Sequence, residues 1–563
     1  MSVQFKHVYD NKSRPKVSFF DKNSKPYGAT GLEFDFVIVG AGSAGCALAN
    51  RLSADPRYTV ALIEAGGKDL SPWIHIPVGY FKTIKNPKLN WMYRTQNDPG
   101  LNGRALNWPR GKTLGGSSSI NGLLYVRGQA RDYDNWRQMG NAGWAWDDVL
   151  PYFKRAEDWE DGEDEYRGQG GPLSVTHSRK SWKIVDAWVK AAQEAGYPYN
   201  PDYNGEKQDG VGYFQLTARN GLRCSSAKAY LAPIKDRKNL QVITNVLTEK
   251  VIIENGRAVG IKGKRGGQEI IVKAKGEVVL SAGAIGSPQI LMLSGVGSSE
   301  ELGRHNIDVV HHSAGVGKNL QDHLQARPIF KCKVPTINTR TVGLFNQAKI
   351  ALEYGIKQTG PMTMAASLGT GYLKTRKELE TPDIQFHIQP FSSENPATGQ
   401  TDPFDAFTAS VLQMRPESAG HLELVSSNPE DHPDIHPNYL ATQLDQQTIV
   451  DGIRIARNIC RQKPVADVIT EEHAPGNVIK DDDYDGLLNW ARDTSTTIYH
   501  PTGTCKMGTD DMAVVDERLR VKGVANLRVA DCSIMPIIVS GNTNAPAIMI
   551  GEKASDMVLE DAR

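Results

Sequence analysis

Residues 34–45 read FDFVIVGAGSAG and combine an apolar, β-branched run with three glycines in the pattern GxGxxG. The run Phe34–Val39 predicts a buried strand, and the small apolar residues after the last glycine predict a helix. In such a unit Gly40 permits a tight turn, Gly42 lets the backbone approach a pyrophosphate, and Gly45 lets the helix pack on the strand. The stretch therefore predicts the first strand–turn–helix unit of a Rossmann-like nucleotide-binding domain.

A second predicted strand, Thr59–Ile63, ends at Glu64, near the spacing expected of a carboxylate that binds a ribose hydroxyl. The glycine pattern alone is a weak signal, and the strand, the helix and this acid make it specific. A carboxylate would repel a ribose 2′-phosphate, so NAD and FAD both fit the pattern.

A long loop of small residues, WPRGKTLGGSSSING, spans residues 108–122 and ends in the apolar stretch Leu123–Val126. Gly, Ser and a single Asn let backbone amides crowd a flat, polar ligand with several acceptors, and a flavin ring is such a ligand. Its length and low charge favour a functional loop over an ordinary surface loop, because long ordered loops are usually functional. This segment therefore favours FAD.

The end of the chain supplies candidate catalytic groups. Tyr499 opens the run YHPTGTCKMG, and Gly541 opens GNTNAPAIMIGEKASDMVL, which places Asn544 just before a predicted apolar helix. The unperturbed pKa of histidine lies nearest neutral pH, so His500 suits a general base. Asn544 can donate a hydrogen bond to a developing oxyanion without changing its charge. A buried structural histidine and a helix-capping asparagine are the alternative interpretations.

These segments together resemble the glucose-methanol-choline (GMC) family of FAD oxidoreductases, and within it the choline dehydrogenase-like branch that also holds aliphatic alcohol dehydrogenases. The resemblance rests on GKTLGGSSSINGLLYVRG from Gly111, GAIGSPQILMLSGVG from Gly283, VGKNLQDH from Val316 and the two terminal segments. It covers essentially residues 34–559, and several matched segments in the family's order are more specific than any one of them.

The resemblance implies FAD as cofactor and oxidation of a primary alcohol, aliphatic or aromatic, to the aldehyde. His500 would take the hydroxyl proton, hydride would pass to flavin N5, and Asn544 would hold the oxygen. The residues assigned in this way to the cofactor site are Gly40, Gly42, Ser43, Ala44, Gly45, Glu64, Ala65, Trp91, Arg110, Gly111, Leu114, Gly115, Gly116, Ser117, Asn121, Gly122, Leu123, Leu124, Val251, Ala282, Gly283, Asp531, Thr543 and Asn544. Those assigned to the substrate pocket are His323, Gln325, His387 and Tyr499, of which the two histidines could equally be structural.

Two positions depart from particular members of the family. Ile120 stands where some members carry the histidine that links FAD covalently, so non-covalent FAD is expected. Gln325 stands where choline oxidases carry a glutamate that pairs with the quaternary ammonium, so choline is disfavoured as a substrate.

Composition gives no sign of a protein that binds nucleic acid, spans a membrane, is held by disulfides or is secreted. The chain has 563 residues, enough for two domains, and its formal net charge of +1 gives no sign of nucleic acid or an anionic membrane as partner. No apolar run reaches the roughly 18 residues that span a bilayer. The six cysteines are scattered without a CxxC pair, which predicts reduced thiols and no metal site. Residues 1–31 lack the apolar core of a secretory signal, so a cytoplasmic location is expected, as a monomer or a homodimer.

The predicted fold class is α/β (α+β overall), with a Rossmann-like FAD-binding domain interleaved with a substrate domain built on an antiparallel sheet flanked by helices. Alternating runs such as Asp383–Gln389 indicate the antiparallel sheet. Residues 1–33 are expected to form an extension, either a disordered tail or an arm on the surface. The expected division is an FAD-binding domain in three parts, 34–160, 215–323 and 495–563, a connecting or substrate-domain segment 161–214, and a substrate-binding domain 324–494.

Two classes of function remain open at this point. The first is oxidation of an alcohol, with oxygen or a quinone as the electron acceptor. The second is a lyase of the same fold, similar to fatty acid photodecarboxylases or hydroxynitrile lyases, in which the flavin does no net redox chemistry. The photodecarboxylases lack the histidine that His500 matches, which argues against that part of the alternative.

Overall fold

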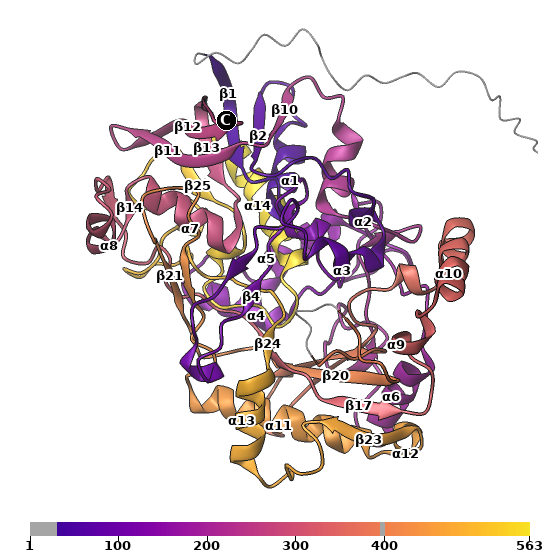
Figure 1. Ribbon diagram of the computed structural model, residues 1–563. Helices are drawn as coiled ribbons and strands as arrows, with labels where there is room; N and C mark the ends of the chain where they lie inside the picture. The colour runs from indigo at the N-terminus through magenta and orange to yellow at the C-terminus, as the bar shows by residue number, and fades with distance from the viewer. Residues whose placement is uncertain (1–30, 395–399) are drawn as a thin grey trace, which may run out of the picture.

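The computed structural model describes residues 31–394 and 400–563. Two sheets, each packed against helices, lie towards opposite ends of the molecule (Figure 1). The predicted fold class, α/β with α+β character overall, is confirmed. The predicted tail or arm lies largely outside the described residues, and its last two positions, Leu32 and Glu33, belong to the first strand.

The first sheet has the strand order β10-β2-β1-β13-β12-β11, with β25 beside β13. Strands β10, β2, β1, β13 and β25 run parallel, and β11, β12 and β13 form an antiparallel extension. All residues of β2 and the last four of β1 are buried, as expected for parallel strands covered on both faces. Its strands are β1 (Leu32–Val39), β2 (Val60–Glu64), β10 (Leu240–Thr244), β11 (Leu247–Glu254), β12 (Arg257–Arg265), β13 (Gln268–Leu280) and β25 (Leu527–Val529).

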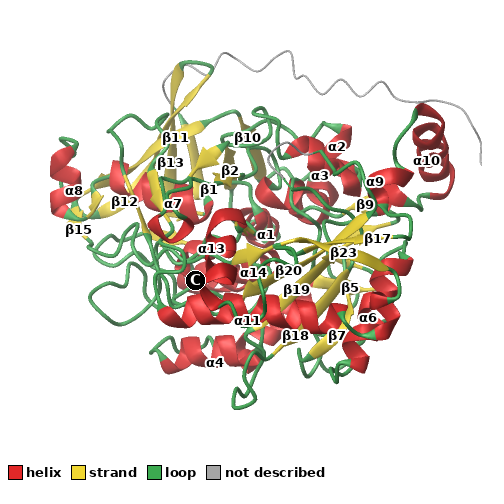
Figure 2. Cartoon of the chain, turned by 60° about the horizontal axis from the view of Figure 1, so that its bottom comes forward, coloured by secondary structure: helices red, strands yellow, loops and turns green. Residues whose placement is uncertain are grey.

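The second sheet has the order β23-β17-β20-β19-β18-β7, and β16 pairs with both β20 and β24. Its pairings are antiparallel, and the helices α6 (Lys183–Glu194) and α11 (Gln443–Cys460) pack on it (Figure 2). Its strands are β7 (Gly210–Tyr213), β16 (Leu324–Ala326), β17 (Ile329–Cys332), β18 (Gly369–Leu373), β19 (Ile384–Gln389), β20 (Ala406–Gln413), β23 (Ile469–Ala474) and β24 (Thr496–Thr497). Strands β7 and β24 thus join this sheet from outside residues 324–494.

The remaining α-helices and five two-stranded ladders of the described residues lie outside the two large sheets. The remaining helices are α1 (Ser43–Leu52), α2 (Pro72–His75), α3 (Tyr80–Thr83), α4 (Ala130–Gln138), α5 (Trp146–Ala156), α7 (Gly283–Leu293), α8 (Ser299–Arg304), α9 (Ile337–Arg340), α10 (Leu344–Lys357), α12 (Lys463–Ala466), α13 (Tyr484–Thr494) and α14 (Asn544–Asp561). Five two-stranded ladders within the described residues pair β3 (Tyr93–Arg94) with β4 (Asn107–Trp108), β5 (Glu157–Trp159) with β6 (Leu173–Val175), β8 (Ala218–Arg219) with β9 (Leu222–Arg223), β14 (Val296–Gly297) with β15 (His311–His312), and β21 (His421–Glu423) with β22 (Asp434–His436). Among the described helices, none has the length and apolar character needed to cross a membrane. All six cysteines are unpaired.

The first and last helices of the fold, α1 and α14, are in direct contact. A Cβ atom on Gly551 of α14 would lie 2.5 Å from the carbonyl oxygen of Ala44, so the two backbones approach as closely as glycine allows. The next residue, Glu552, is fully buried and accepts hydrogen bonds from Arg51 of α1 at 2.8 Å, Arg155 of α5 at 2.7 Å and the hydroxyl of Tyr230 at 2.8 Å. The C-terminal helix is therefore fixed against the first helix by close packing and by a paired buried charge.

We expect Gly551→Ala to lower the stability of the fold and the temperature at which FAD is released. The added methyl group meets backbone atoms that cannot rotate away, and overpacking of this kind costs about 1–3 kcal/mol. The measurement is the rise of flavin fluorescence on heating.

Gly355→Ala in α10 is the matched control. It also replaces a helical glycine, but nothing lies within 4 Å of the added Cβ, and alanine is the better helix former. The tight contact between α1 and α14 would be contradicted if the two variants released FAD at the same temperature.

Candidate active site

Glycines at the end of β1 bring three backbone segments into contact. A Cβ on Gly40, whose φ is +101°, would lie 2.4 Å from the carbonyl oxygen of Ser281. A Cβ on Gly45 would lie 1.9 Å from the carbonyl oxygen of Gly40, and one on Gly116 would lie 2.7 Å from Cα of Gly42. Only glycine fits at these positions, so the first turn, the end of β13 and the serine-rich loop form a cradle of open backbone. A pyrophosphate could approach such a cradle closely.

Glu64 ends β2 beside this cradle. Its carboxylate accepts the backbone N–H of Ala41 at 2.9 Å and that of Gly66 at 2.8 Å. Burial raises the pKa of Glu64 to about 7, and the two N–H donors oppose that shift. The side chain is therefore held in one orientation at the carboxyl end of the strand, where a Rossmann-like fold binds a ribose.

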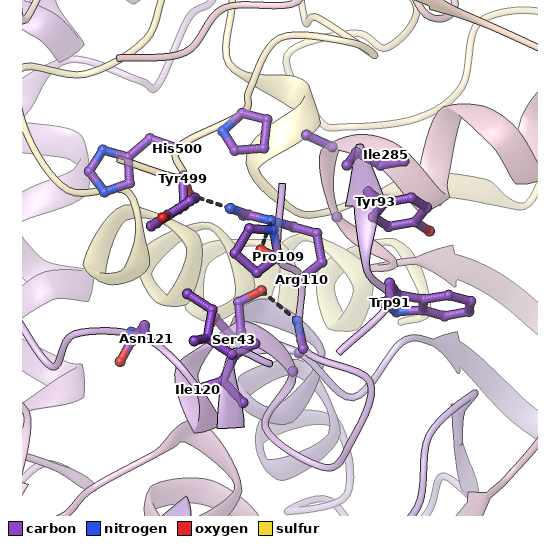
Figure 3. A pocket seen from close by; sticks show the side chains of 18 of the residues that line it. Ser43, Trp91, Tyr93, Pro109, Arg110, Ile120, Asn121, Ile285, Tyr499 and His500 are labelled. Atoms are coloured by element: carbon purple, nitrogen blue, oxygen red, sulfur yellow. Dashed lines mark hydrogen bonds between the residues drawn. The ribbon is translucent and has the colours of Figure 1, made fainter. Parts of the chain in front are cut away.

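Arg110 links the serine-rich loop to the C-terminal segment. Its guanidinium donates to the backbone carbonyl of Tyr499 at 2.5 Å and to that of Pro109 at 2.7 Å. Figure 3 shows Arg110 between the aromatic ring of Trp91 on one side and His500 on the other. The residues predicted for the cofactor and those predicted for catalysis thus share one cavity.

Hydrogen bonds fix both the position and the tautomer of His500. Its backbone N–H donates to Asp322 at 2.6 Å, and its Nδ1 lies 3.1 Å from Nδ1 of His323. Nε2 of His323 lies 2.9 Å from the carbonyl oxygen of Met414, which can only accept, so the neutral His323 ring carries its proton on Nε2. His500 must then donate from Nδ1 to His323, which leaves a lone pair on Nε2 of His500. That atom lies 3.1 Å from the side-chain nitrogen of Asn542.

Electrostatics keep these rings neutral. Burial, and after it the nearby His323, His387 and Arg110, hold the pKa of His500 well below its ordinary value. Burial likewise lowers the pKa of His323 to about 4 and that of His387 to about 3. At neutral pH His500 is therefore unprotonated at Nε2, and the lone pair of that atom accepts the hydrogen bond from Asn542 at the cavity wall.

The asparagine beside His500 is Asn542, whereas the sequence predicts Asn544 in that place. The side-chain oxygen of Asn544 accepts the hydroxyl of Ser43 at 2.7 Å, at the start of α1. Asn544 is the first residue of α14, so its side chain points along the contact with α1, whereas Asn542 lies in the turn before the helix. The side chain that contacts His500 is thus that of Asn542, and the catalytic role predicted for Asn544 stays a prediction.

A single cavity of about 400 Å³ joins the cradle to His500. The predicted site residues that line it are Gly40, Gly42, Ser43, Ala44, Glu64, Ala65, Trp91, Arg110, Gly111, Gly116, Ser117, Asn121, Gly122, Leu124, Ala282, Gly283, Gln325, His387, Tyr499, His500, Asp531, Thr543 and Asn544. Those that do not are Gly45, Leu114, Gly115, Leu123, Val251 and His323. His323 nevertheless contacts the site through His500, and Gly45 packs under the turn.

Comparison with known proteins agrees with this geometry. Profiles described as GMC oxidoreductase match residues 34–325 and 416–551. The chain is 42% identical over 531 residues to an oxygen-dependent choline dehydrogenase of Vibrio vulnificus (93% of this chain, 94% of the relative). It is 41% identical over 537 residues to an alcohol dehydrogenase [acceptor] of Pseudomonas putida (93% and 96%). A formate oxidase variant of Aspergillus oryzae, solved to study modification of its FAD, superimposes with a TM-score of 0.88 at 28% identity (95% and 99%).

The chain belongs to the GMC oxidoreductase family. It is an FAD-dependent oxidoreductase of the class that acts on the CH–OH group of donors. The site fits the cofactor on its own geometry, because the glycine cradle offers open backbone to a pyrophosphate and Glu64 lies where a ribose would bind.

Val251 has a different place in this GMC oxidoreductase from the one predicted. It is buried in β11, where its backbone N–H donates to the hydroxyl of Ser294 at 2.8 Å. The cavity is lined instead by the residues just before it, Val246, Leu247 and Thr248, which follow the end of β10. Such a fold binds its ligand at the carboxyl ends of its parallel strands. Residues 246–248 lie at such an end, whereas Val251 lies within the antiparallel strand β11.

Several cavity residues were not predicted from the sequence. Among them are Tyr80, Phe81, Lys85, Arg327, Gln389, Phe391, Cys532 and Asn542. Arg327 could have been found, because it follows Gln325 by two positions in a strand-like run and side chains two apart in a strand share a face. The aromatic residues at 80 and 81 carry no such signal.

Proposed function

We propose that the protein oxidises a primary alcohol to the aldehyde, with His500 as the general base. The observation that carries the proposal is the unprotonated Nε2 of His500 in the same cavity as the cofactor cradle, where a substrate hydroxyl would take the place of the Asn542 N–H that Nε2 accepts in this structure. An alcohol donates hydride poorly until its hydroxyl proton begins to leave, and a neutral imidazole within hydrogen-bond reach can take that proton. FAD, when bound, supplies the hydride acceptor at its N5 atom.

Asn542 is proposed to hold the alcohol oxygen beside His500. Its side-chain nitrogen lies 3.1 Å from Nε2 of His500, so an oxygen placed there would meet a donor and a base together. Its side-chain oxygen is buried and has no hydrogen-bond partner among the described residues, which leaves a free acceptor at the same point. Such positioning supplies much of the rate of a two-group reaction.

Hydrogen bonds hold His500 in place while its ring carries the proton taken from the substrate. As Nε2 gains a proton the ring becomes cationic, and Nδ1 keeps its hydrogen bond to His323. Asp322 holds the backbone of His500 and also accepts the hydroxyl of Thr497 at 2.5 Å and that of Tyr439. Burial of the whole group excludes water that would compete for the proton.

Choline is not the proposed substrate, although choline dehydrogenases are among the relatives. Gln325 lines the cavity and carries no charge, so a quaternary ammonium would find no carboxylate there. The lyase alternative is not favoured, since the named relatives are dehydrogenases and an oxidase. Oxygen and a quinone both remain candidates for the electron acceptor, and non-covalent attachment of FAD is part of the proposal.

Anaerobic mixing with primary alcohols is expected to bleach the visible absorbance of the bound flavin, and His500→Ala is expected to slow that step. Loss of a general base typically costs about 10²–10⁴ in rate. FAD content should stay near that of the wild type, because His500 binds neighbouring side chains rather than the cradle.

The pH profile provides the control. A general base acts only when it is unprotonated. Because the pKa of His500 is lowered, kcat/KM of the wild type should fall with decreasing pH only below pH 6.5. This acid limb should vanish in His500→Ala. Equal flavin reduction by wild type and variant would show that His500 is not the base.

The variants Asn542→Ala and Asn544→Ala should fail in different ways. Asn542→Ala should slow flavin reduction by roughly 10²-fold with normal FAD content, because it removes a donor at the reacting oxygen. Asn544→Ala should chiefly weaken FAD retention, because it breaks the hydrogen bond to Ser43 in the cradle. Stopped-flow reduction and the ratio of visible to ultraviolet absorbance separate the two effects, and the opposite pattern would restore Asn544 as the catalytic residue.

FAD is expected to leave the protein on acid precipitation. Ile120 lines the cavity and offers no nucleophilic atom to the cofactor. After centrifugation all yellow colour should be in the supernatant, and colour on the protein pellet would demonstrate a covalent bond.

A further inference from the structure

Arg327 shares one face of a strand with the groups that support catalysis. His323, Gln325 and Arg327 alternate along β16 and its ends, so their side chains point the same way. His323 contacts His500, and both Gln325 and Arg327 line the cavity. At roughly 3.3 Å per residue, the Cα atoms of His323 and Arg327 are about 13 Å apart, which puts Arg327 at the far end of a small substrate.

The guanidinium of Arg327 is enclosed and has no partner among the described residues. Its Nε is buried without an acceptor, and no hydrogen bond or ion pair joins the side chain to residues 31–394 or 400–563. The nearest carboxylate influence is that of Asp402, which already accepts the hydroxyl of Ser392 at 2.6 Å and the backbone N–H of Glu394 at 3.0 Å. Residues 395–399 read NPATG and contain no acid.

The part of the cavity around Arg327 carries positive but no negative charge among the described residues. Tyr80, His387 and Tyr499 line the cavity close enough to Arg327 to be influenced by its charge, and Lys85 is a further cation in the lining. The carboxylates that line the cavity elsewhere are Glu64, Asp431 and Asp531. They are engaged with backbone N–H groups or with polar side chains away from this end.

Buried polar atoms at this end also lack partners. Nε2 of His387 and the side-chain oxygens of Gln325 and Gln389 are buried without a hydrogen bond among the described residues. Burial lowers the pKa of Arg327, which reflects the cost of keeping a cation there without a counterion. Such groups are normally satisfied, so an unpaired set in one cavity indicates a ligand that completes it.

We propose that Arg327 is a specificity-determining residue that binds a carboxylate of the substrate, so that the enzyme oxidises primary alcohols that also carry a carboxylate group. The guanidinium would bind the two carboxylate oxygens through paired N–H donors, with the hydroxyl of the same molecule directed to His500. This assignment rests on the proposed alcohol oxidation and narrows its substrate class. A quaternary ammonium would instead meet a like charge at this end.

The test compares matched alcohols on the holoenzyme. The pairs are 4-(hydroxymethyl)benzoate with 4-(hydroxymethyl)benzamide, and 6-hydroxyhexanoate with 6-hydroxyhexanamide. The wild type should favour the carboxylate in at least one pair by roughly 10²-fold in kcat/KM, the scale of a buried charge pair. Arg327→Gln should remove that preference with unchanged FAD content, and Arg327→Lys should retain part of it.

Lys82→Gln is the matched charge control. Lys82 is exposed on α3, where its ammonium lies 5.7 Å from the ring centre of Trp73, outside the cavity lining. The variant removes one positive charge near the same end of the molecule, and the preference for the carboxylate should persist. A loss equal to that in Arg327→Gln would indicate general attraction of anions and would overturn the assignment.

Binding provides a readout that does not depend on turnover. 4-Methylbenzoate has no hydroxyl, and it should perturb the visible spectrum of the bound flavin in the wild type and bind at least tenfold more weakly to Arg327→Gln. If no alcohol reduces the flavin but this dependence on Arg327 holds, the proposed oxidation fails while the anion site stands. No preference for carboxylates in the wild type, or loss of FAD in both Arg327 variants, would overturn the assignment.

Discussion

The contact between α1 and α14 is the constraint on which the site depends. Gly551 lets the last helix approach the backbone of Ala44, and buried Glu552 holds it there through Arg51, Arg155 and Tyr230. This contact carries the turn before α14 to the start of α1, where Asn544 accepts the hydroxyl of Ser43 across 501 positions of the chain. The close approach of these two helices at Gly551 thus brings the cofactor cradle and the candidate catalytic groups to one cavity.

The site also depends on which ring nitrogens of His323 and His500 carry protons. The carbonyl of Met414 determines which nitrogen of His323 carries a proton, and His323 in turn determines which nitrogen of His500 is unprotonated. The residue just after β20 of the second sheet thus sets which nitrogen of the proposed base is protonated. Burial, and after it the neighbouring His323, His387 and Arg110, lower the pKa of His500, so Nε2 is unprotonated at neutral pH without a partner carboxylate on the ring.

The sequence allowed the first sheet to be predicted well, because Gly40, Gly42 and Gly45 stand between a buried strand and a helix, and few structures need glycine at that spacing. The motif resemblance likewise led to the family, which the comparisons confirm. Asn542 and Asn544 could not be separated, since both lie in one turn and only the first residue of α14 decides which points to His500. That Val251 lies outside the cavity could not be predicted either, because the register of β11 is set by its pairing partners rather than by its own residues.

The segment His323–Arg327, which contains β16, indicates how the substrate could change while the proposed base is kept. Alternation along β16 and its ends places His323, Gln325 and Arg327 on one face, where His323 contacts His500 and the other two line the cavity. His323 orients the proposed base, His500, whereas Gln325 and Arg327 set the charge of the pocket. A neutral Gln325 and an unpaired Arg327 therefore alter which substrates fit without disturbing His500. On this proposal, a chain 42% identical to a choline dehydrogenase would take a substrate of the opposite charge with the same catalytic groups.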